Sequence, residues 1–329
     1  MTTACERILT VSNLKTYFRT PDGIVRAVDD VSFHLNRGEV LALVGESGCG
    51  KSVTAHSIMG LVKAPPAKLE GSIVFDCREL IGLSSSEYRK IRGMQISMVF
   101  QEPMSSFDPL YTVGEQLMEV AQAHMPWGEE EAKERIIETL RLVHIPEPDK
   151  RYSEYPHQMS GGMLQRIMIA MALITSPKII IADEPTTALD VTIQAQVLNL
   201  MQDIQSEYDG SIIFITHDLG TVAEIADRVH VMYAGKIVEK ASVVELFDNP
   251  LHPYTAGLLA SRVRREYKGQ DLPYIEGYVP RADQFPEGCR FNPRCLRATA
   301  KCRELQPPDL EPAPGHTVAC WLYEGGDGR

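Results

Sequence analysis

Hydrophobic and polar positions alternate in the first part of the chain. Residues 8–18 and 24–35 follow this period of two on either side of a Thr-Pro-Asp-Gly turn, which predicts a pair of strands. Later runs at 39–44, 178–183 and 211–216 are apolar on both faces, as is typical of central parallel strands that helices cover. Shorter runs of the same character predict further strands at 71–76 and 94–100.

Helical periodicity separates these runs. The segment 128–144 places four apolar side chains on one face, and its acidic start suits a helix N-terminus; these side chains are Ala132, Ile136, Leu140 and Val143. Comparable segments predict helices at 52–62, 164–174 and 194–208. Because strands and helices alternate along the chain, we expect an α/β core, with a helical insertion at about 102–170.

Composition narrows the functions that this pattern allows. The chain has 329 residues, of which 44% are hydrophobic and 23% charged, so we expect a folded globular protein. Its 33 basic and 44 acidic residues give a net charge of −11, which argues against a general nucleic-acid binder. No run approaches the roughly 20 apolar residues of a membrane-spanning helix, and the first residues lack a secretory signal. Taken alone, this composition predicts a cytoplasmic protein.

A glycine-rich motif supplies the first candidate chemistry. Residues 45–52, Gly-Glu-Ser-Gly-Cys-Gly-Lys-Ser, match the phosphate-loop pattern between a predicted strand and a predicted helix. Glycines allow consecutive backbone N–H groups to surround phosphate oxygens, and the helix N-terminus adds positive charge. We expect Lys51 to reach the β- and γ-phosphates and Ser52 to bind Mg²⁺. The nucleotide-binding residues predicted in this motif are Gly45, Ser47, Gly48, Gly50, Lys51, Ser52 and Val53.

Two further motifs fit a nucleotide hydrolase. Asp183 ends a predicted strand and Glu184 follows it, so we expect Asp183 to bind Mg²⁺ and Glu184 to polarise the attacking water. Without the phosphate loop, this pair would be compatible with an ordinary solvated loop. Ser160, Gly161 and Gly162 precede a predicted helix and form a second candidate anion site, although such a sequence by itself is usually a turn.

The order of these motifs resembles the nucleotide-binding subunits of ATP-binding cassette (ABC) transporters. That family has a phosphate loop, a glutamine loop, a signature, an acidic strand and a switch histidine, and this chain has GESGCGKS, VFQEP, MSGGM, IIIADEPTTALD and ITHD in the same order. The resemblance covers residues 7–260. It implies a P-loop ABC ATPase cassette at 1–255, with a RecA-like α/β core and a helical subdomain at about 102–170.

The resemblance also implies roles for single residues. Phe18, or its neighbour Tyr17, would stack on adenine. Gln101 would sense the γ-phosphate and Mg²⁺ and couple to a membrane subunit. His217 would contact the γ-phosphate and help to organise Glu184 and the water.

A second subunit is implied by the signature motif. In the family, the residues that correspond to Ser160, Gly161 and Gly162 bind the γ-phosphate of the nucleotide held by the partner subunit, and Asp190 would lie at the seam of the dimer. Met159 and Met163 replace the usual Leu and Gln of the signature. Since the Ser-Gly-Gly that meets phosphate is intact, we expect little loss of function.

Longer strings are similar to the ATPases of oligopeptide and dipeptide importers, namely YPHQMSGGM, IADEPTTALDVTIQAQ, VMYAGKIVE, HPYT at 252–255 and CRFNPRC. This resemblance implies an ATPase that drives uptake of di- or oligopeptides from the cytoplasmic face of the inner membrane, as a peripheral subunit. The implied partners are a second ABC ATPase in a heterodimer, two transmembrane permease subunits and an extracytoplasmic peptide-binding protein, with no nucleic acid. The alternatives are a nickel or other small-solute importer ATPase and, more distantly, a soluble ATPase that acts on nucleic acid.

The C-terminal residues 256–329 are rich in proline and contain four of the seven cysteines, so we expect a small irregular appendage with a regulatory or metal-binding role. The spacing of Cys289, Cys295, Cys302 and Cys320 lacks the paired C-x2-C turns of most zinc ribbons, whereas iron–sulfur clusters accept looser spacing. Members of the peptide-importer subfamily carry a [4Fe-4S] cluster in this region, and the resemblance therefore implies one here. Zinc is the alternative, with His316 as a further possible ligand.

Overall fold

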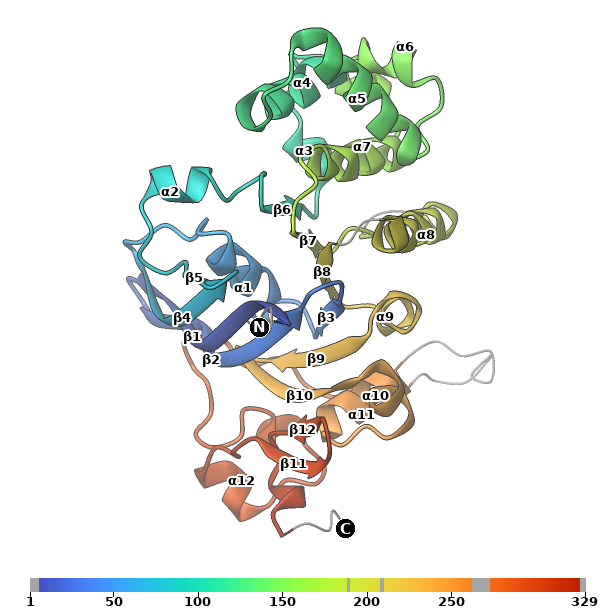
Figure 1. Cartoon of the computed structure of the whole chain (residues 1–329). Helices are drawn as coiled ribbons and strands as arrows, with labels where there is room; N and C mark the ends of the chain where they lie inside the picture. Colours follow the sequence, from blue (N-terminus) through green and yellow to red (C-terminus); the bar gives the residue numbers. More distant parts are fainter. Residues whose placement is uncertain (1–5, 188–189, 208–209, 262–272, 326–329) are drawn as a thin grey trace, which may run out of the picture. The chain divides into compact units, whose positions relative to one another are not determined.

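A computed structural model describes residues 6–187, 190–207, 210–261 and 273–325 (Figure 1). The chain divides into two compact parts. The terminal part consists of Met1–Leu35, Val40–Gly82 and Thr216–Arg329, and the middle part of Asn36–Glu39 and Leu83–Ile215. Among the described residues, no helix combines the length and the apolar character that crossing a bilayer requires.

The terminal part begins with an antiparallel sheet. Its strand order is β2-β1-β4-β5, and the bounds are β1 (Arg7–Thr20), β2 (Gly23–Asn36), β4 (Ala67–Phe75) and β5 (Arg78–Glu79). Leu9 of β1 lies opposite Phe75 of β4, and both side chains are buried. The strands predicted at 8–18 and 24–35 are confirmed. The strand predicted at 71–76 begins four residues earlier, since β4 continues along β1 as far as Phe18.

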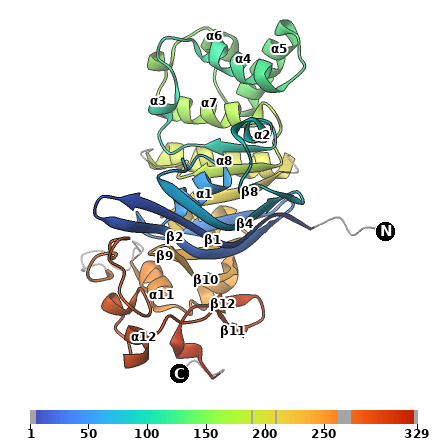
Figure 2. The same cartoon turned by 90° about the vertical axis from the view of Figure 1, so that its left-hand side faces the viewer.

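A second group of strands in the terminal part runs in the order β11-β12-β10-β9-β3. Figure 2 labels β9, β10, β12 and β11 of this group. Its strands are β3 (Val40–Val44), β9 (Arg228–Tyr233), β10 (Lys236–Ser242), β11 (Leu310–Ala313) and β12 (His316–Val318). The helices of this part are α1 (Lys51–Ile58), α9 (Leu219–Ile225), α10 (Val243–Asp248), α11 (Pro253–Ala260) and α12 (Ala300–Glu304). β3 and β9 are parallel, and the remaining neighbours are antiparallel.

The C-terminal residues are not the separate appendage that the sequence predicts. β12 pairs with β10, with Val318 opposite Glu239, and the Ala319 N–H donates to the Val238 carbonyl over 2.8 Å. The sheet therefore continues into the C-terminal segment. Pairing with a distant strand edge is not visible in a short, proline-rich stretch of sequence.

Aromatic side chains tie the same segment to the core of the terminal part. Tyr233, Tyr254 and Phe291 are buried, and their ring centroids lie 4.6 to 5.4 Å apart in tilted and edge-on arrangements. They belong to a cluster that includes Ala42 and Val44 of β3. Rings at such distances contribute packing and quadrupole interactions together.

Parallel strands form the centre of the middle part. Their order is β8-β7-β6, and their bounds are β6 (Ile96–Val99), β7 (Ile179–Asp183) and β8 (Ser211–Thr216). All three strands are buried along their whole length. α8 (Val191–Glu207) connects β7 to β8, as a crossover between parallel strands requires. The strands predicted at 178–183 and 211–216 are confirmed.

The middle part also holds a set of helices. These are α2 (Ser85–Arg89), α3 (Pro103–Ser106), α4 (Val113–His124), α5 (Glu129–Leu142), α6 (Pro148–Tyr152) and α7 (Gly161–Leu173). α4, α5 and α7 pack against one another (Figure 1). α5 confirms the helix predicted at 128–144, because Ala132, Ile136 and Leu140 are fully buried on one face.

Candidate nucleotide site

The predicted phosphate loop connects β3 to α1 in the terminal part. β3 ends at Val44 and α1 begins at Lys51. The buried Lys51 ammonium donates to the Gly45 carbonyl over 2.7 Å and to the Glu46 carbonyl over 3.2 Å. Ser47 and Gly48 are exposed at the tip. The loop therefore folds back on the first residue of the helix and presents its tip outward.

Gly45 shows why this loop needs glycine. Its φ is +151°, and a Cβ placed there would lie 2.2 Å from the carbonyl oxygen of Met232 in β9. Any side chain would push the loop away from β9. The backbone conformation that surrounds phosphate thus depends on a close approach between two strand ends.

The two candidates for adenine binding differ in their surroundings. The Tyr17 hydroxyl donates to Asp29 Oδ1, and burial together with this bond raises the pKa of Tyr17. Phe18 follows it in β1, so its side chain points to the opposite face of the strand. Since Tyr17 is held by Asp29, Phe18 is the better candidate for stacking on a base.

His217 directly follows β8 and is exposed. The next residue, Asp218, caps α9 by accepting from the Gly220 N–H over 2.7 Å. Asp218 also donates its own N–H to the Thr216 hydroxyl over 3.0 Å. The turn that carries His217 is therefore fixed on both sides.

In the middle part, two of the predicted hydrolytic residues, Gln101 and Glu184, come together. The Gln101 side-chain amide donates to Glu184 Oε2 over 3.1 Å, although the two residues are far apart in sequence. Thr187 donates its hydroxyl to the same oxygen over 2.9 Å. Asp183 is buried at the end of β7, and Glu184 follows with a φ of +49°. This turn directs the Glu184 carboxylate out of the strand toward Gln101.

Thr187 was not among the predicted site residues. It stands three positions after Glu184, in the sequence DEPTT, and a hydroxyl at that spacing from a carboxylate is the signal that could have identified it. By donating to Glu184 Oε2, it holds the carboxylate in one orientation.

The signature residues lie at the N-terminus of α7. Ser160 is the N-cap and accepts from the Met163 N–H over 3.3 Å, and both Ser160 and Gly161 are exposed. A Cβ on Gly162 would lie 2.7 Å from Ile193 Cγ2. Asp190 in turn accepts from the Ile193 N–H over 2.9 Å at the start of α8. The structure thus places the signature and Asp190 on either side of Ile193.

The predicted iron–sulfur or zinc site is not supported. Among the residues that the structure describes, no group of three or more His, Cys, Asp or Glu side chains is arranged to hold a metal ion. Three of the four cysteines pack against apolar clusters, Cys289 and Cys295 around Phe291, and Cys320 beside Val318, and Cys302 is buried.

The four thiols lie close enough to one another to affect each other's protonation. Burial, together with the neighbouring thiols of Cys302, Cys320 and Cys295, raises the pKa of Cys289 to about 11, and burial also raises the pKa of Cys295 and Cys320. His316, the further possible ligand, has its Nε2 2.8 Å from Oε1 of the buried Glu239 carboxylate. These side chains therefore contribute to packing and to a buried polar contact.

Comparison with known proteins finds two family patterns in this chain. The sequence pattern of the family described as ABC transporter matches residues 28–187. The pattern described as oligopeptide/dipeptide transporter, C-terminal region, matches residues 238–302. The two patterns together include the phosphate loop, the signature, Glu184, Tyr254 and the first three C-terminal cysteines.

Three curated proteins are similar over nearly the whole chain. The oligopeptide transport ATP-binding protein AppD of Bacillus subtilis (strain 168) is 52% identical over 96% of this chain and 97% of that protein. The dipeptide transport ATP-binding protein DppD of the same organism is 50% identical over 97% and 96%. The oligopeptide transport ATP-binding protein OppD of Escherichia coli (strain K12) is 47% identical over 96% and 93%.

Solved structures agree with the fold. The ATP-binding cassette MJ0796, in a dimeric post-hydrolysis state with ADP and Pi, is 27% identical with a TM-score of 0.65, over 71% of this chain and 98% of that one. The cbiO1 protein of Clostridium perfringens, part of the ABC transporter complex cbiONQ, is 28% identical with a TM-score of 0.64, over 74% and 92%. The predicted ABC ATPase cassette is therefore confirmed.

Proposed function

The chain belongs to the family of ABC transporter ATP-binding proteins of oligopeptide and dipeptide transport, and from this premise we propose how its residues use ATP. It is an ATPase subunit of a di- or oligopeptide importer. A nickel importer is not favoured, because the similar proteins named above are peptide-transport proteins. A cytoplasmic, peripheral position at the inner membrane fits this role.

ATP binding is assigned to the phosphate loop. Its exposed tip and the N-terminus of α1 supply backbone N–H groups and a positive helix end for the phosphates. Lys51 would exchange the carbonyls of Gly45 and Glu46 for phosphate oxygens. Phe18 would stack on adenine. The hydroxyl of Ser52 and the carboxylate of Asp183 are ligands that suit Mg²⁺, which neutralises phosphate charge when it is bound.

Hydrolysis is assigned to Glu184, and its contact with Gln101 is the observation that carries the proposal. A carboxylate whose oxygen is held by Gln101 and Thr187 is oriented to accept a proton from water. His217 would contact the γ-phosphate. Because Gln101 is bonded to the catalytic carboxylate, a movement of its loop changes the orientation of Glu184.

The signature is assigned to binding the nucleotide held by a second ATP-binding subunit. Ser160 and Gly161 are exposed at the start of a thirteen-residue helix, where an anion is favoured. The resemblance makes that anion the γ-phosphate of a nucleotide on the partner. We propose that the partner is a different ATPase chain, as the peptide-importer resemblance implies.

The loop after Gln101 is the proposed contact with the permease subunits. Large apolar side chains are exposed there, with 62% of Met104, 79% of Leu110 and 54% of Tyr111 accessible. Exposed large apolar side chains are common on surfaces that bind other proteins. Peptide would reach the permeases from an extracytoplasmic binding protein.

The test is Glu184→Gln in the purified, assembled transporter. We expect ATP turnover and peptide uptake to fall by about a hundredfold or more, with ATP binding retained, because the substitution removes the base and keeps the shape. Glu134→Gln, an exposed carboxylate on α5, is the matched control and should leave both rates unchanged. Unchanged turnover in Glu184→Gln would overturn the role of Glu184.

The same preparation tests the partners. Mass spectrometry of the intact complex should find one copy of this chain, a different ATP-binding chain and two permease chains. Two copies of this chain without another ATPase would overturn the heterodimer and leave the role of Glu184 untouched.

A further inference from the structure

A short C-terminal segment, Cys289–Cys295, contacts the nucleotide-binding half of the terminal part through two arginines. We infer that Arg294 is a positioning residue for the phosphate loop, acting through Glu46. In a similar way, Arg290 supports the strand that carries Tyr17 and Phe18, acting through Asp29. This inference rests on the proposed binding of ATP by the phosphate loop. It gives the C-terminal region a role in nucleotide affinity.

Arg294 forms a two-pronged ion pair with the second residue of the phosphate loop. Its Nη1 lies 2.7 Å from Glu46 Oε2, and its Nη2 lies 3.1 Å from Glu46 Oε1. The Arg294 side chain is 4% exposed and that of Glu46 is 32% exposed. A bidentate pair of this kind fixes both the distance and the orientation of the carboxylate.

Other contacts make Arg294 a rigid support. Its Nε donates to the Glu276 carbonyl over 2.9 Å, and its Nη2 donates to the Ile275 carbonyl over 3.2 Å. Burial alone would lower the pKa of Arg294, but the bonds to Glu46 and to the Tyr233 hydroxyl raise it above its ordinary value. Because the guanidinium is anchored on the C-terminal segment, Glu46 cannot move without breaking charged hydrogen bonds.

A second residue of the C-terminal half holds Glu46 by its backbone. The Glu46 N–H donates to the Tyr254 hydroxyl over 2.9 Å. Tyr254 is fully buried in α11, where its ring packs against Tyr233 and Phe291. Glu46 is therefore held at its side chain by Arg294 and at its backbone by Tyr254.

The contacts of Arg294 and Tyr254 with Glu46 matter because the contact of Lys51 with the loop must change when phosphate binds. In the structure, Lys51 closes the loop by donating to the carbonyls of Gly45 and Glu46. Phosphate oxygens would compete for the same ammonium. When Lys51 turns toward phosphate, Arg294 and Tyr254 remain to keep Glu46 in place. A loop preorganised in this way loses less conformational entropy on binding.

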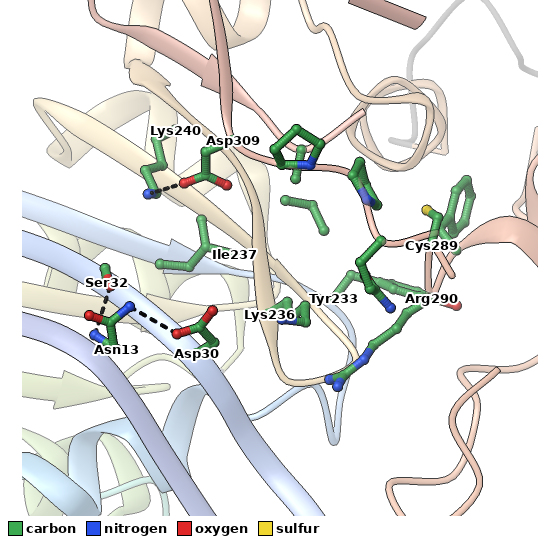
Figure 3. A pocket seen from close by; sticks show the side chains of 16 residues that line it. Asn13, Asp30, Ser32, Tyr233, Lys236, Ile237, Lys240, Cys289, Arg290 and Asp309 are labelled. Carbon is green, nitrogen blue, oxygen red and sulfur yellow. Dashed lines mark hydrogen bonds and ion pairs between the residues drawn. The ribbon is translucent and has the colours of Figure 1, made fainter. Parts of the chain in front are cut away.

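Arg290 supports the strand β1 through Asp29. Its guanidinium pairs with Asp29 and donates to the Ala234 carbonyl, and Asp29 accepts from the Tyr17 hydroxyl. Figure 3 shows Arg290 extending away from Cys289 toward the turn that precedes Lys236, at the edge of a pocket of about 230 Å³. The segment thus contacts β2 directly through Arg290, which reaches β1 only by way of Asp29, and it contacts the phosphate loop through Arg294.

The test compares Arg294→Gln, Glu46→Gln and the double variant in the assembled transporter, with MgATP as the probe. Each single change should raise the Kd and the KM for ATP about tenfold, since a displaced binding loop costs affinity of this order. The kcat should stay within about twofold, because neither residue touches the reacting atoms. The double variant should bind ATP as each single variant does, because both remove the same contact.

Arg281→Gln is the matched control. It removes an exposed ion pair with Asp283 in the same C-terminal region and should leave ATP affinity unchanged. Arg294→Lys, which keeps the charge and loses the two-pronged geometry, should restore part of the affinity. If Arg294→Gln does not fold, Glu46→Gln still tests the contact, since it leaves Arg294 in place.

The outcomes separate this inference from the proposed function. ATP affinity equal to wild type in a folded Glu46→Gln or Arg294→Gln chain would overturn the inference, as would additive losses in the double variant. A fall in kcat at unchanged KM would also overturn it. A wild-type chain that does not bind ATP would instead overturn the proposed function.

Discussion

His252 is fully buried at the start of α11, where its Nδ1 accepts from the Tyr254 N–H over 3.0 Å. Burial lowers the pKa of His252 to about 4. An unfolded chain would bind this proton near pH 6.5. Between these two values the unfolded state holds more protons than the folded state, so stability falls as the pH falls through this window.

His252→Asn should flatten this dependence. Asparagine keeps an acceptor for the helix N-terminus and does not titrate. The free energy of unfolding is measured in urea at pH 7 and at pH 5. From the higher to the lower pH it should fall by about 1–2 kcal/mol more in wild type than in the variant. His157→Asn, at an exposed histidine, should behave as wild type does. Equal losses in wild type and His252→Asn would show that His252 does not titrate in this way.

At the scale of elements, β12 is attached by a buried charge as well as by its backbone. Glu239 of β10 is 1% exposed. Its carboxylate accepts from the Leu251 N–H over 2.7 Å and the His252 N–H over 2.9 Å, and it lies 2.8 Å from His316 Nε2 of β12. Three partners from two other segments compensate the cost of burying this carboxylate.

Glu239→Gln should therefore loosen the C-terminal strand. The NH2 group of the new glutamine would face a backbone N–H group, and two donors cannot bond to each other. We therefore expect a loss of about 2–3 kcal/mol in the free energy of unfolding. Amide hydrogen exchange at 316–318 should accelerate together with that loss. Glu304→Gln, at an exposed carboxylate of α12, should change neither. Protection of 316–318 equal to wild type would mean that backbone pairing alone holds β12.

The same elements show how far sequence reasoning reaches. β7 and β8 were predictable because a fully buried parallel strand is a continuous apolar run. The phosphate loop was predictable because its strand, loop and helix are contiguous. β12 was not, since its place depends on Glu239 and on a strand edge far away in the sequence. The contact of Arg294 with Glu46 spans 248 positions and has no local signature.

At the scale of the whole molecule, the C-terminal region is part of the core of this chain. The cassette MJ0796 matches over 98% of its own length and 71% of this chain, so part of this chain has no counterpart in that cassette. Here, however, Tyr233 of β9 packs against Phe291 with ring centroids 5.2 Å apart, and Val318 lies beside Leu251. Removing this C-terminal region would expose the apolar side chains of Tyr233 and Leu251 that pack against it.

A chain that ends at residue 272 is therefore expected to aggregate. It loses Phe291 and Val318 from the core, together with the arginine that holds Glu46. Removing a large buried aromatic residue alone costs about 3–5 kcal/mol, a large share of the stability of a typical domain. Soluble yield and a cooperative thermal transition distinguish this outcome from a milder one. If the shortened chain is soluble, melts cooperatively and merely binds ATP more weakly, the extension serves to position the phosphate loop and the fold does not depend on it.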